Sequence, residues 1–588
     1  MVAALFVVAG FVWLHPASAH LLAGNTSTVI GDGTDSITIP WQYHLILDTL
    51  REAPSRLLFG GIYSDQVSAP EGYAVYVPYS ERVLVLLLAP FMNRDLLPTG
   101  VVWAFVVITG VSMHACGRLL GWPRTIAFAL ALAFAICPYT RARAVVHNAM
   151  VGVYFAPLVV AALRLVAGAP RKLGWSSRRE LVVGALLLVC AVSAFQYYAI
   201  ILIGFAPLFA VLYVLMLPYG ASKVHAAKRL FIAILPALLL LGWTKVMPSA
   251  PSDTKRFATV ERPAAVVKKE RENFLKWYGA HASHYVSGDV RFGDRDVLPW
   301  RSAITAEVRH DFPANLHEST NGIRWTILAA AAALLVIVAP RRLRRRLAKT
   351  DRKLAVFALV FGACAFLVSL SPQGLRYYDT DLGPSLLLAR LVPEFRVPNR
   401  VGVLVHFAAL LCAGIVFTLL ASRLRRRVPA GAVGAALLVL VVVEYLPLHP
   451  IIESPMPARR AALVPPSGAC GAGILLPYAS WEADESRYYH SMSEVRGTSC
   501  KILHGGYLTV EEPPLRTIFA TGKYAPSDRE RATTFARCTR ASWAAFAPDV
   551  PEDYRRAFCA DLGWRFVSPD ACRTSDVVTE ARPLRECL

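Results

Sequence analysis

Long apolar runs separated by short polar segments make up most of the first three quarters of the chain. A helix needs roughly 20 apolar residues to cross a bilayer, or a few fewer where the bilayer adapts. Runs of about this kind lie at 2–15, 98–117, 125–139, 146–167, 181–198, 199–217, 229–247, 323–340, 354–371, 401–421 and 430–448. The pattern predicts an all-α polytopic membrane bundle of about eleven transmembrane helices, followed by a polar C-terminal segment.

One further apolar run, at residues 83–92, is too short to cross a bilayer, and Pro90 and Arg94 mark its end. If this run crossed, the basic segment at 118–124 and every later basic segment would change sides. We therefore expect a short interfacial or re-entrant helix that belongs to the first outer loop.

The basic residues predict the side on which each loop lies. Short segments rich in Lys and Arg separate apolar runs at 118–124, 171–179, 223–229, 341–353 and 423–427. Short basic loops between spans are typical of the cytoplasmic face. The outer segments are then 20–97, 140–147, 248–322, 372–400 and 449–588. The sequence thus predicts two domains, with residues 1–448 in the membrane and 449–588 extracytoplasmic.

The first apolar run has two interpretations. Residues 2–14 followed by Ala17-Ser18-Ala19 resemble the core and cleavage site of a signal peptide, although no basic region precedes them. We expect a retained first helix whose N-terminus lies inside. Residues 20–97 lie outside under both interpretations, so the functional prediction does not depend on this choice.

Composition supports a membrane protein and excludes other classes. Of the 588 residues, 55% are hydrophobic and 18% charged, with a mean hydropathy of +0.44, whereas soluble chains carry about 25% charged residues. The formal net charge of +21 is concentrated in the short basic loops. Contact with anionic membrane lipid is a natural consequence, while nucleic-acid binding is not expected because no fold for it accompanies the charge.

The eleven cysteines divide by environment. Five fall within or at the edge of apolar runs, where a thiol acts as a small hydrophobe: Cys116, Cys137, Cys190, Cys364 and Cys412. The other six lie in the polar C-terminal segment: Cys470, Cys500, Cys538, Cys559, Cys572 and Cys587. An even number outside the membrane indicates three disulfides, whose connectivity stays open among fifteen pairings. Short apolar runs between Pro/Gly turns predict a small disulfide-bonded α+β domain.

The first outer loop carries the candidate catalytic acids, Asp32 and Asp35, on a glycine-containing stretch that is followed by Trp41 and an amphipathic segment. Two carboxylates three residues apart can both reach a cleft at the membrane surface. The alternative is a turn with Asp35 or Ser36 capping the next helix. A calcium loop is disfavoured because no Glu completes the ligand spacing.

Cationic residues lie in two further outer segments. Arg141, Arg143 and His147 follow Pro138, and Arg396 and Arg400 flank Pro398. Arginines outside, against the charge rule, suit an anionic phosphate because the guanidinium offers a planar fork of donors. The alternatives are lipid headgroups or the acids of the first outer loop as partners for the arginines, and helix capping for His147.

Other polar residues mark the ends of spans on the same side. Gln196, Tyr197 and Tyr198 form a tight turn between two apolar runs, and Glu318 precedes the run that begins at 323. Tyrosine is expected at a bilayer interface in any membrane protein, and Glu318 can equally be a helix cap. We place them in a candidate substrate pocket together with Trp41.

These motifs and their order resemble the GT-C superfamily of integral-membrane glycosyltransferases, in particular its bacterial, mannosyltransferase-like branch. The matching pieces are Gly31-Asp32-x-x-Asp35 with Trp41, Ser68-Ala69-Pro70-Glu71-Gly72, Pro138-x-x-Arg141 with His147, Gln196-Tyr197-Tyr198, Glu318 before a span, and Phe395-Arg396-Val397-Pro398-Asn399-Arg400. They extend over roughly residues 1–420, and each is short, so their order and membrane side carry the likeness. The C-terminal segment matches no family that we can name.

The resemblance implies a transferase of the bacterial cytoplasmic (inner) membrane that uses a polyprenyl-phosphate-linked sugar donor. In such enzymes an acid of the first outer loop acts at the acceptor, and basic residues hold the donor phosphate. Metal-dependent members add an acid in the second outer loop, where this chain has Arg141, Arg143 and His147 instead. We therefore expect metal-independent transfer of a hexosyl or pentosyl group, without a cofactor, to a glycan, lipid or protein acceptor hydroxyl.

Two other classes of function remain open at this stage. A transporter or flippase could use the same arginines for an anionic headgroup, but the apolar runs contain no clear pair of ionisable residues and no inverted repeat. A non-catalytic assembly or scaffold protein could bind a partner through its disulfide-bonded domain. Loss of sugar transfer with intact membrane insertion in Asp32→Ala and Asp35→Ala would single out the transferase.

Overall fold

The structure of the protein, a computed structural model, describes part of the chain. The described residues are 1–31, 35–59, 62–64, 73–75, 77–168, 175–218, 220–246, 285, 321–340, 347, 349–370, 384–391, 395, 397–447, 450–457, 470–476, 494–503, 526–547, 550–575, 582 and 587.

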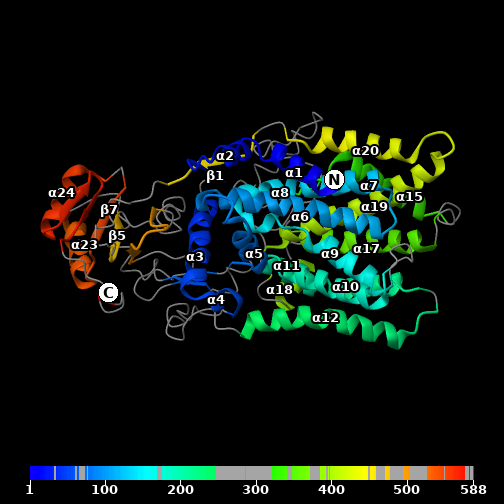
Figure 1. Cartoon of the computed structure of the whole chain (residues 1–588), viewed down its shortest axis with the longest axis horizontal. Coiled ribbons are helices and arrows are strands. Elements are labelled where there is room, and N and C mark those ends of the chain that lie inside the picture. The colour runs from blue at the N-terminus through cyan, green and yellow to red at the C-terminus, as the bar shows by residue number, and fades with distance from the viewer. Residues whose placement is uncertain are drawn as a thin grey trace.

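An elongated helical bundle occupies one part of the molecule, and a small sheet domain lies at its other end (Figure 1). The bundle consists of α1 (Val2–Trp13), α2 (Ala17–Ala23), α6 (Leu97–Leu119), α7 (Arg124–Ala135), α8 (Pro138–Val146), η3 (Asn148–Val151), α9 (Phe155–Val166), α10 (Ser177–Val192), α11 (Gln196–Met216), α12 (Lys223–Val246), α15 (Trp325–Val338), α17 (Lys349–Ser369), α18 (Pro384–Leu391), η9 (Pro398–Val401), α19 (Gly402–Leu424) and α20 (Ala430–Tyr445).

Every apolar run predicted as a span contains one of these helices. Within the described residues, six helices are long and apolar enough to cross a membrane, and α1 with α2 forms a seventh candidate bent by 107°. α9, α15 and α20 are apolar but shorter. The chain is therefore a polytopic membrane protein, while the number of eleven spans is not confirmed by the helix lengths.

The segment predicted as the second outer loop, 140–147, is mostly helical. α7 breaks at residues 136–137 and α8 begins at Pro138, a residue that suits the first turn of a helix because no intrahelical partner awaits its missing N–H. The Thr140 hydroxyl donates to the carbonyl of Cys137, 2.7 Å away, and ties down the start of α8. The cationic residues of this segment therefore lie on a helix instead of an open loop.

The first outer loop forms its own layer at the end of the bundle nearest the sheet domain (Figure 1). It contains β1 (Thr28–Ile30), η1 (Asp35–Ile37), α3 (Thr38–Glu52), α4 (Pro54–Phe59), β2 (Ile62–Ser64), β3 (Tyr73–Val75), α5 (Tyr79–Leu88) and η2 (Arg94–Leu96). β2 and β3 pair antiparallel, and α3 packs against α5 and α6. α5 is the short helix that the parity of the basic loops required for the run at 83–92.

The C-terminal segment returns to this layer before it folds. β4 (Glu453–Pro455) pairs antiparallel with β1, so that Ile30 lies opposite Glu453 and Thr28 opposite Pro455. The amide of Met456 also donates to the carbonyl of Ser27, at 2.8 Å. The residues after α20 therefore lie at the same end of the bundle as the first outer loop.

The described part of the C-terminal segment is an α+β domain, as expected. Its elements are β5 (Ala472–Leu476), β6 (Lys501–Ile502), α23 (Pro526–Cys538), β7 (Trp543–Phe546), α24 (Glu552–Asp561), β8 (Arg565–Ser568) and β9 (Ala571–Arg573). The five strands lie in the order β6-β5-β7-β9-β8, with β5 parallel to β6 and β7, and the remaining pairs antiparallel. Three disulfides join Cys470 to Cys500, Cys538 to Cys587 and Cys559 to Cys572.

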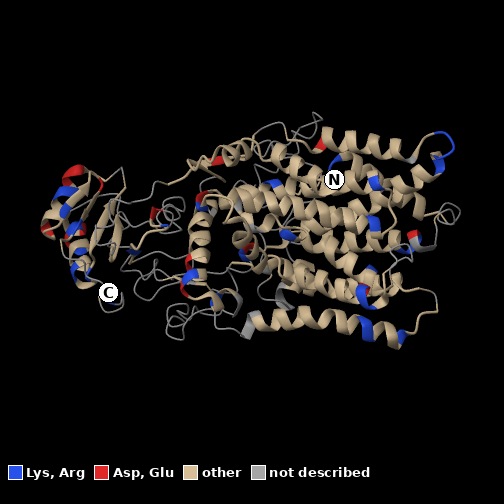
Figure 2. Cartoon of the chain, viewed as in Figure 1, with Lys and Arg blue, Asp and Glu red and all other residues tan. Residues whose placement is uncertain are grey.

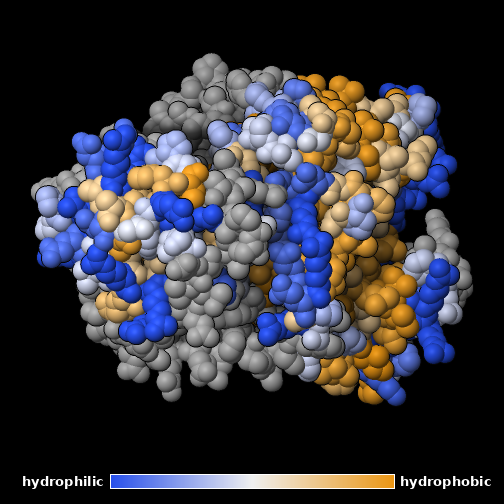
Figure 3. Space-filling view, turned by 60° about the vertical axis from the view of Figure 1, so that its left-hand side comes forward, coloured by the Kyte–Doolittle hydropathy of each residue, from blue (hydrophilic) through white to orange (hydrophobic). Residues whose placement is uncertain are grey.

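Charge and hydropathy divide the surface along the long axis of the molecule. The lysines and arginines of the bundle gather at the helix ends farthest from the sheet domain, where α19 ends and α12 begins (Figure 2). Hydrophobic side chains cover the middle of the bundle between hydrophilic surfaces (Figure 3). An exposed apolar belt of this extent is typical of lipid contact. The described basic residues at these helix ends thus share one end of the bundle, opposite the first outer loop.

Candidate functional site

Three segments far apart in the sequence meet where α8, α11 and η9 come together. The hydroxyl of Tyr139 on α8 lies 3.2 Å from the hydroxyl of Tyr198 on α11 and 3.5 Å from the carbonyl oxygen of Arg400 on η9. Tyr198 in turn donates to the carbonyl of Met150, at 2.5 Å. Two buried tyrosines, Tyr139 and Tyr198, therefore join α8, the start of α11 and η9.

Arg400 is the central cation of this meeting point. Its guanidinium lies 4.9 Å from the ring centroid of Tyr197, and its Nη2 atom is 3.5 Å from Nε2 of His147. The Tyr197 hydroxyl accepts a hydrogen bond of 2.7 Å from the amide of Val397, which holds the ring beneath the guanidinium. Arg400 and His147 are half-buried, so an anion that approaches this end of the bundle can reach both.

Arg141 and Arg143 point to different neighbours. Side chains two residues apart on a helix differ in direction by about 200°. The Nη1 atom of Arg141 donates to the carbonyl of Trp13, 3.1 Å away, and the guanidinium lies 5.8 Å from the Trp13 ring. Arg143 is fully buried, with its guanidinium 4.9 Å from the ring centroid of Tyr139. Both arginines thus supply positive charge from within the protein.

The acid-bearing stretch of the first outer loop is anchored beside α8. The backbone of Gly31 has a φ of +144°, and a Cβ there would lie 2.9 Å from the carbonyl oxygen of Val145 and closer still to Ser36. Only glycine permits that close approach. Gly31 also receives a hydrogen bond from the hydroxyl of Ser454, at 2.8 Å. The two ends of the stretch, Gly31 and η1, which begins at Asp35, both pack near α8.

A pair of buried amides links the start of α15 to η9. The side-chain nitrogen of Asn321 donates to the side-chain oxygen of Asn399 and approaches its backbone carbonyl at 3.3 Å. Gly402 makes room for this pair, since a Cβ there would lie 2.4 Å from Asn321. The segment that follows position 318 is therefore held next to Arg400.

The predicted site residues fall into three groups. Side chains are described for Trp41, Arg141, Arg143, His147, Tyr197, Tyr198 and Arg400, and only the backbone for Asp35 and Gln196. Asp32, Glu318 and Arg396 lie outside the described residues. The structure brings His147, Tyr197 and Arg400 together, whereas Arg141 contacts α1 and Trp41 is buried on α3. Among the described residues, no three His, Cys, Asp or Glu side chains gather as a metal site would require.

The sequence prediction missed two residues of this cluster. Tyr139 joins Tyr198, Arg143 and η9, and Asn399 joins η9 to Asn321. Tyr139 precedes Arg143 by four residues, which is the spacing that stacks two side chains on one helix face. This signal becomes visible only once residues 138–146 are recognised as a helix.

No protein-family model matches the chain, and no curated protein matches it. It is similar to the structure of the Archaeoglobus fulgidus oligosaccharyltransferase in complex with Zn and sulfate, with 14% identity, a TM-score of 0.44, and coverage of 95% of this chain and 69% of that one. It is also similar to the arabinofuranosyltransferase AftD from Mycobacteria, with 15% identity and a TM-score of 0.49 over 94% of this chain and 36% of that one. ArnT from Cupriavidus metallidurans in the apo state has 12% identity and a TM-score of 0.28, with coverage of 97% and 96%.

The chain thus spans about a third of the length of AftD. These structural neighbours are glycosyltransferases of the GT-C type, the superfamily that the sequence motifs resemble. Each of these TM-scores is below 0.5, so the substrates of these proteins are not assigned to this chain. The assignment of this chain rests on its own residues and their geometry.

Proposed function

We propose that this chain is a membrane glycosyltransferase of the GT-C superfamily. It moves a sugar from a polyprenyl-phosphate-linked donor to an acceptor hydroxyl on the outer face of the cytoplasmic membrane. The observation that supports this most is the meeting of His147, Tyr197 and Arg400 from three separate segments. The basic turn at 423–427 lies at the C-terminal end of α19, whereas Arg400 lies at the opposite end of that helix. Cations at that end, beside an acid-bearing loop, suit a lipid-anchored phosphate and a nucleophile that needs a base.

The donor phosphate binds at Arg400 and His147 in this proposal. A guanidinium held over a tyrosine ring keeps its edge available for in-plane hydrogen bonds, which match the oxygens of a phosphate. Arg141 and Arg143, buried behind the cluster, add positive potential that water screens little. Gln196, Arg396 and Glu318 remain proposed members of the same pocket.

Transfer then proceeds by displacement at the anomeric carbon. Asp32, or Asp35, accepts the proton of the acceptor hydroxyl as its oxygen forms the new glycosidic bond. The bond between the anomeric carbon and the phosphate oxygen breaks, and the negative charge that develops on the departing polyprenyl phosphate is stabilised by Arg400 and its cationic neighbours. We favour Asp32 as the base because it lies between two glycines, where an acceptor can approach closely.

We test the donor site with Arg400→Ala and, as a matched control, Arg423→Ala in the basic turn at the opposite end of the bundle. Photo-crosslinking to a photoactivatable polyprenyl-phosphate probe should fall roughly tenfold or more for Arg400→Ala, as expected for a lost charged hydrogen bond, and stay unchanged for Arg423→Ala. Equal crosslinking of both variants and the unaltered protein would remove Arg400 from the donor site.

We test the acid separately with Asp32→Asn. Loss of a general base should lower turnover by roughly 10²–10⁴-fold, while probe crosslinking persists. Loss of a helix cap instead costs only about 1 kcal/mol of stability. If Asp35→Asn is inactive and Asp32→Asn is not, the two roles are exchanged; if both variants retain transfer, the loop is structural.

A further inference from the structure

A buried ion pair joins the C-terminal domain to the first outer loop. The Nε atom of Arg496 lies 3.1 Å from Oδ1 of Asp95 on η2, and the same carboxylate oxygen is 2.9 Å from Nε2 of His44 on α3. The exposed fractions of Arg496, Asp95 and His44 are 3%, 8% and 3%. Three segments separated by up to 452 residues (496 − 44) therefore share one dry polar contact.

The carboxylate is itself held in place. Asn93 caps η2 by accepting a hydrogen bond of 3.0 Å from the amide of Asp95. Next to it, Arg94 forms an ion pair with Asp48 of α3, at 3.2 Å. η2 and α3 consequently form one unit into which Arg496 is inserted.

Arg496 also contacts the residues that follow β4. Its Nη1 atom donates to the carbonyl of Pro457, at 2.7 Å, directly after β4, which pairs with β1. The guanidinium thus connects three places: the segment before the domain, the domain itself and η2. A surface contact between independent domains would not need an arginine buried to this extent.

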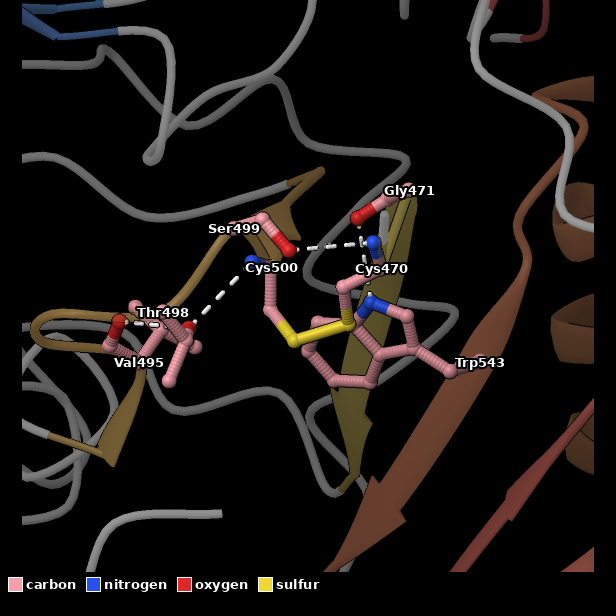
Figure 4. The surroundings of a disulfide bond; sticks show 7 residues. All are labelled: Cys470, Gly471, Val495, Thr498, Ser499, Cys500 and Trp543. Carbon is pink, nitrogen blue, oxygen red and sulfur yellow. Dashed lines mark hydrogen bonds between the residues drawn. A yellow bond between two sulfur atoms is a disulfide. The ribbon is translucent and has the colours of Figure 1, made fainter. Parts of the chain in front are cut away.

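A disulfide holds the turn that carries Arg496 (Figure 4). Cys470 and Cys500 are joined across a separation of 30 residues, and the amide of Cys470 donates to the hydroxyl of Ser499, at 3.1 Å. Within the turn, the Thr498 hydroxyl donates to the carbonyl of Val495, at 2.7 Å. Arg496 is therefore presented by a braced turn on the edge of the five-stranded sheet.

We infer that Arg496 is a positioning residue, through which the C-terminal domain holds α3 and, with it, η1, which packs against α8. α3 begins at Thr38, one residue after η1 ends, and η1 itself begins at Asp35, so a helix held at His44 also holds the position of Asp35. The effect on catalysis rests on the proposed function, whereas the effect on α3 does not.

The physical reason is the cost of removing a charged partner from a buried carboxylate. Removing one partner of a buried pair destabilises the surrounding contact strongly, because the remaining charge has been taken out of water without compensation. In Arg496→Ala, the buried Asp95 keeps His44 and loses its guanidinium partner, so the contact between η2, α3 and the C-terminal domain is weakened. α3 should then open more often, without loss of the bundle.

The first test measures hydrogen exchange of the full-length protein in nanodiscs. Arg496→Ala should speed exchange of the α3 amides by roughly tenfold or more, as local opening becomes easier. The matched control is Arg556→Ala, which removes an exposed arginine of the same domain that pairs with Glu552; it should leave α3 unchanged. Unaltered exchange in α3 of Arg496→Ala would overturn the inference.

A second variant guards against simple misfolding of the C-terminal domain. Asp95→Asn lies outside that domain, so its three disulfides should remain intact by alkylation and mass analysis, and α3 should exchange faster as in Arg496→Ala. The double variant Asp95→Asn/Arg496→Ala should exchange no faster than the more severe single variant, because the two residues act through one contact. Additive effects would show that Arg496 does not act through Asp95.

The third test uses sugar transfer. Arg496→Ala should lower kcat by roughly 10–100-fold, the cost of a misplaced catalytic group, with less than about a twofold change in KM for the lipid donor, because Arg400 is not on α3. A raised donor KM with normal kcat contradicts a positioning role. Absence of transfer in the unaltered protein would contradict the proposed function alone, since the exchange result stands without it.

Discussion

The helical bundle and the C-terminal domain use the same residue type in opposite ways. All five cysteines of the bundle are free thiols, and three of them, Cys116, Cys137 and Cys412, are buried as small hydrophobic side chains. All six of the C-terminal domain are disulfide-bonded. The bundle packs one long continuous core, whereas the domain has two small core clusters on either face of its sheet. A small domain in water needs covalent links that a membrane bundle does not.

Glycines show how closely the helices of the bundle pack. In the bundle, Gly110 lies against Phe6 of α1 and Gly414 against Trp122, so closely that a Cβ would lie 2.5 Å and 2.1 Å from the respective rings. Helices in lipid gain little from burying apolar surface, and close backbone approach gives them dispersion contacts instead. Close packing therefore stabilises the bundle without covalent links, whereas the domain has three disulfides in addition to its packed core.

Removal of the disulfides should have the largest effect, because it should destabilise the C-terminal domain and leave the bundle folded. Replacing Cys559 and Cys572 with Ser should destabilise the C-terminal domain by about 2–5 kcal/mol, and reduction of all three bonds should unfold it. Protease resistance of the domain should be lost, while circular dichroism still reports the helices of the bundle. The matched control Cys412→Ala changes a free thiol and should leave the domain resistant. Loss of helicity on reduction would contradict independent stabilisation of the two regions.

A buried carboxyl sets the first outer loop apart from both regions. Burial raises the pKa of Glu81 on α5 from its ordinary value of 4.5 to about 7, while hydrogen bonding from Tyr43 of α3 and the charge of Arg82 act in the lowering direction. The unfolded chain releases this proton at lower pH than the folded one. Stability should therefore fall as pH rises from about 4.5 to 7 and change little on this account outside that window.

The size of this effect is of the order of 2–4 kcal/mol. Glu81→Gln, which is neutral throughout, should flatten the dependence of the thermal midpoint on pH across the window. Arg82 donates to the carbonyls of Leu57 and Val77 as well, so Glu81→Gln leaves it with partners. The same pH dependence in the protein and in Glu81→Gln would assign the effect to another group.

A glycine substitution tests the packing of the bundle. Gly110→Ala places a methyl group against the ring of Phe6 and should cost about 1–3 kcal/mol, the usual range for overpacking. Gly431→Ala on α20 meets no atom within 4 Å and should be neutral or stabilise by up to about 1 kcal/mol, because alanine favours a helix. Thermal unfolding in detergent checks both, and equal effects would mean that α1 does not pack on α6 as described.

The smallest effect should come from an exposed ion pair of the C-terminal domain. Glu552 and Arg556 form an i,i+4 pair on α24, with side chains 62% and 70% exposed. Such pairs contribute little, since water screens both charges and two flexible side chains must be ordered. Glu552→Gln should shift the stability of the domain by less than about 0.5 kcal/mol. A larger loss would mean that this helix depends on surface charge more than on its disulfides.

Much of the architecture follows from local sequence. Each apolar run carries a helix because hydrogen bonding within the segment is the way a backbone is satisfied in lipid. The short run at 83–92 gives α5, and the six polar-segment cysteines give three disulfides. Their pairing could not be predicted, because fifteen connectivities fit the sequence equally and strand order selects among them.

For the candidate site, the sequence predicted three residues that the structure brings together, but not their geometry. Order and membrane side pointed to His147, Tyr197 and Arg400, which the structure brings together. Arg141 and Arg143 looked equivalent in the sequence. On α8 they point in different directions, so that Arg141 contacts Trp13 and Arg143 contacts Tyr139. Contacts of this kind depend on how distant segments pack, such as Tyr139 with Tyr198, 59 residues apart, and His147 with Arg400, 253 residues apart.

The sequence by itself determined that the chain is a membrane protein with a disulfide-bonded polar domain. Hydropathy and charge placement act within each segment, and the even number of cysteines reflects an oxidising compartment. Only the tertiary structure decided that Arg496 is inserted between η2 and the segment after β4. An isolated arginine in a polar segment carries no sign of its partner. The partner is set by burial, since a charge excluded from water must meet its counterpart wherever the chain has folded it.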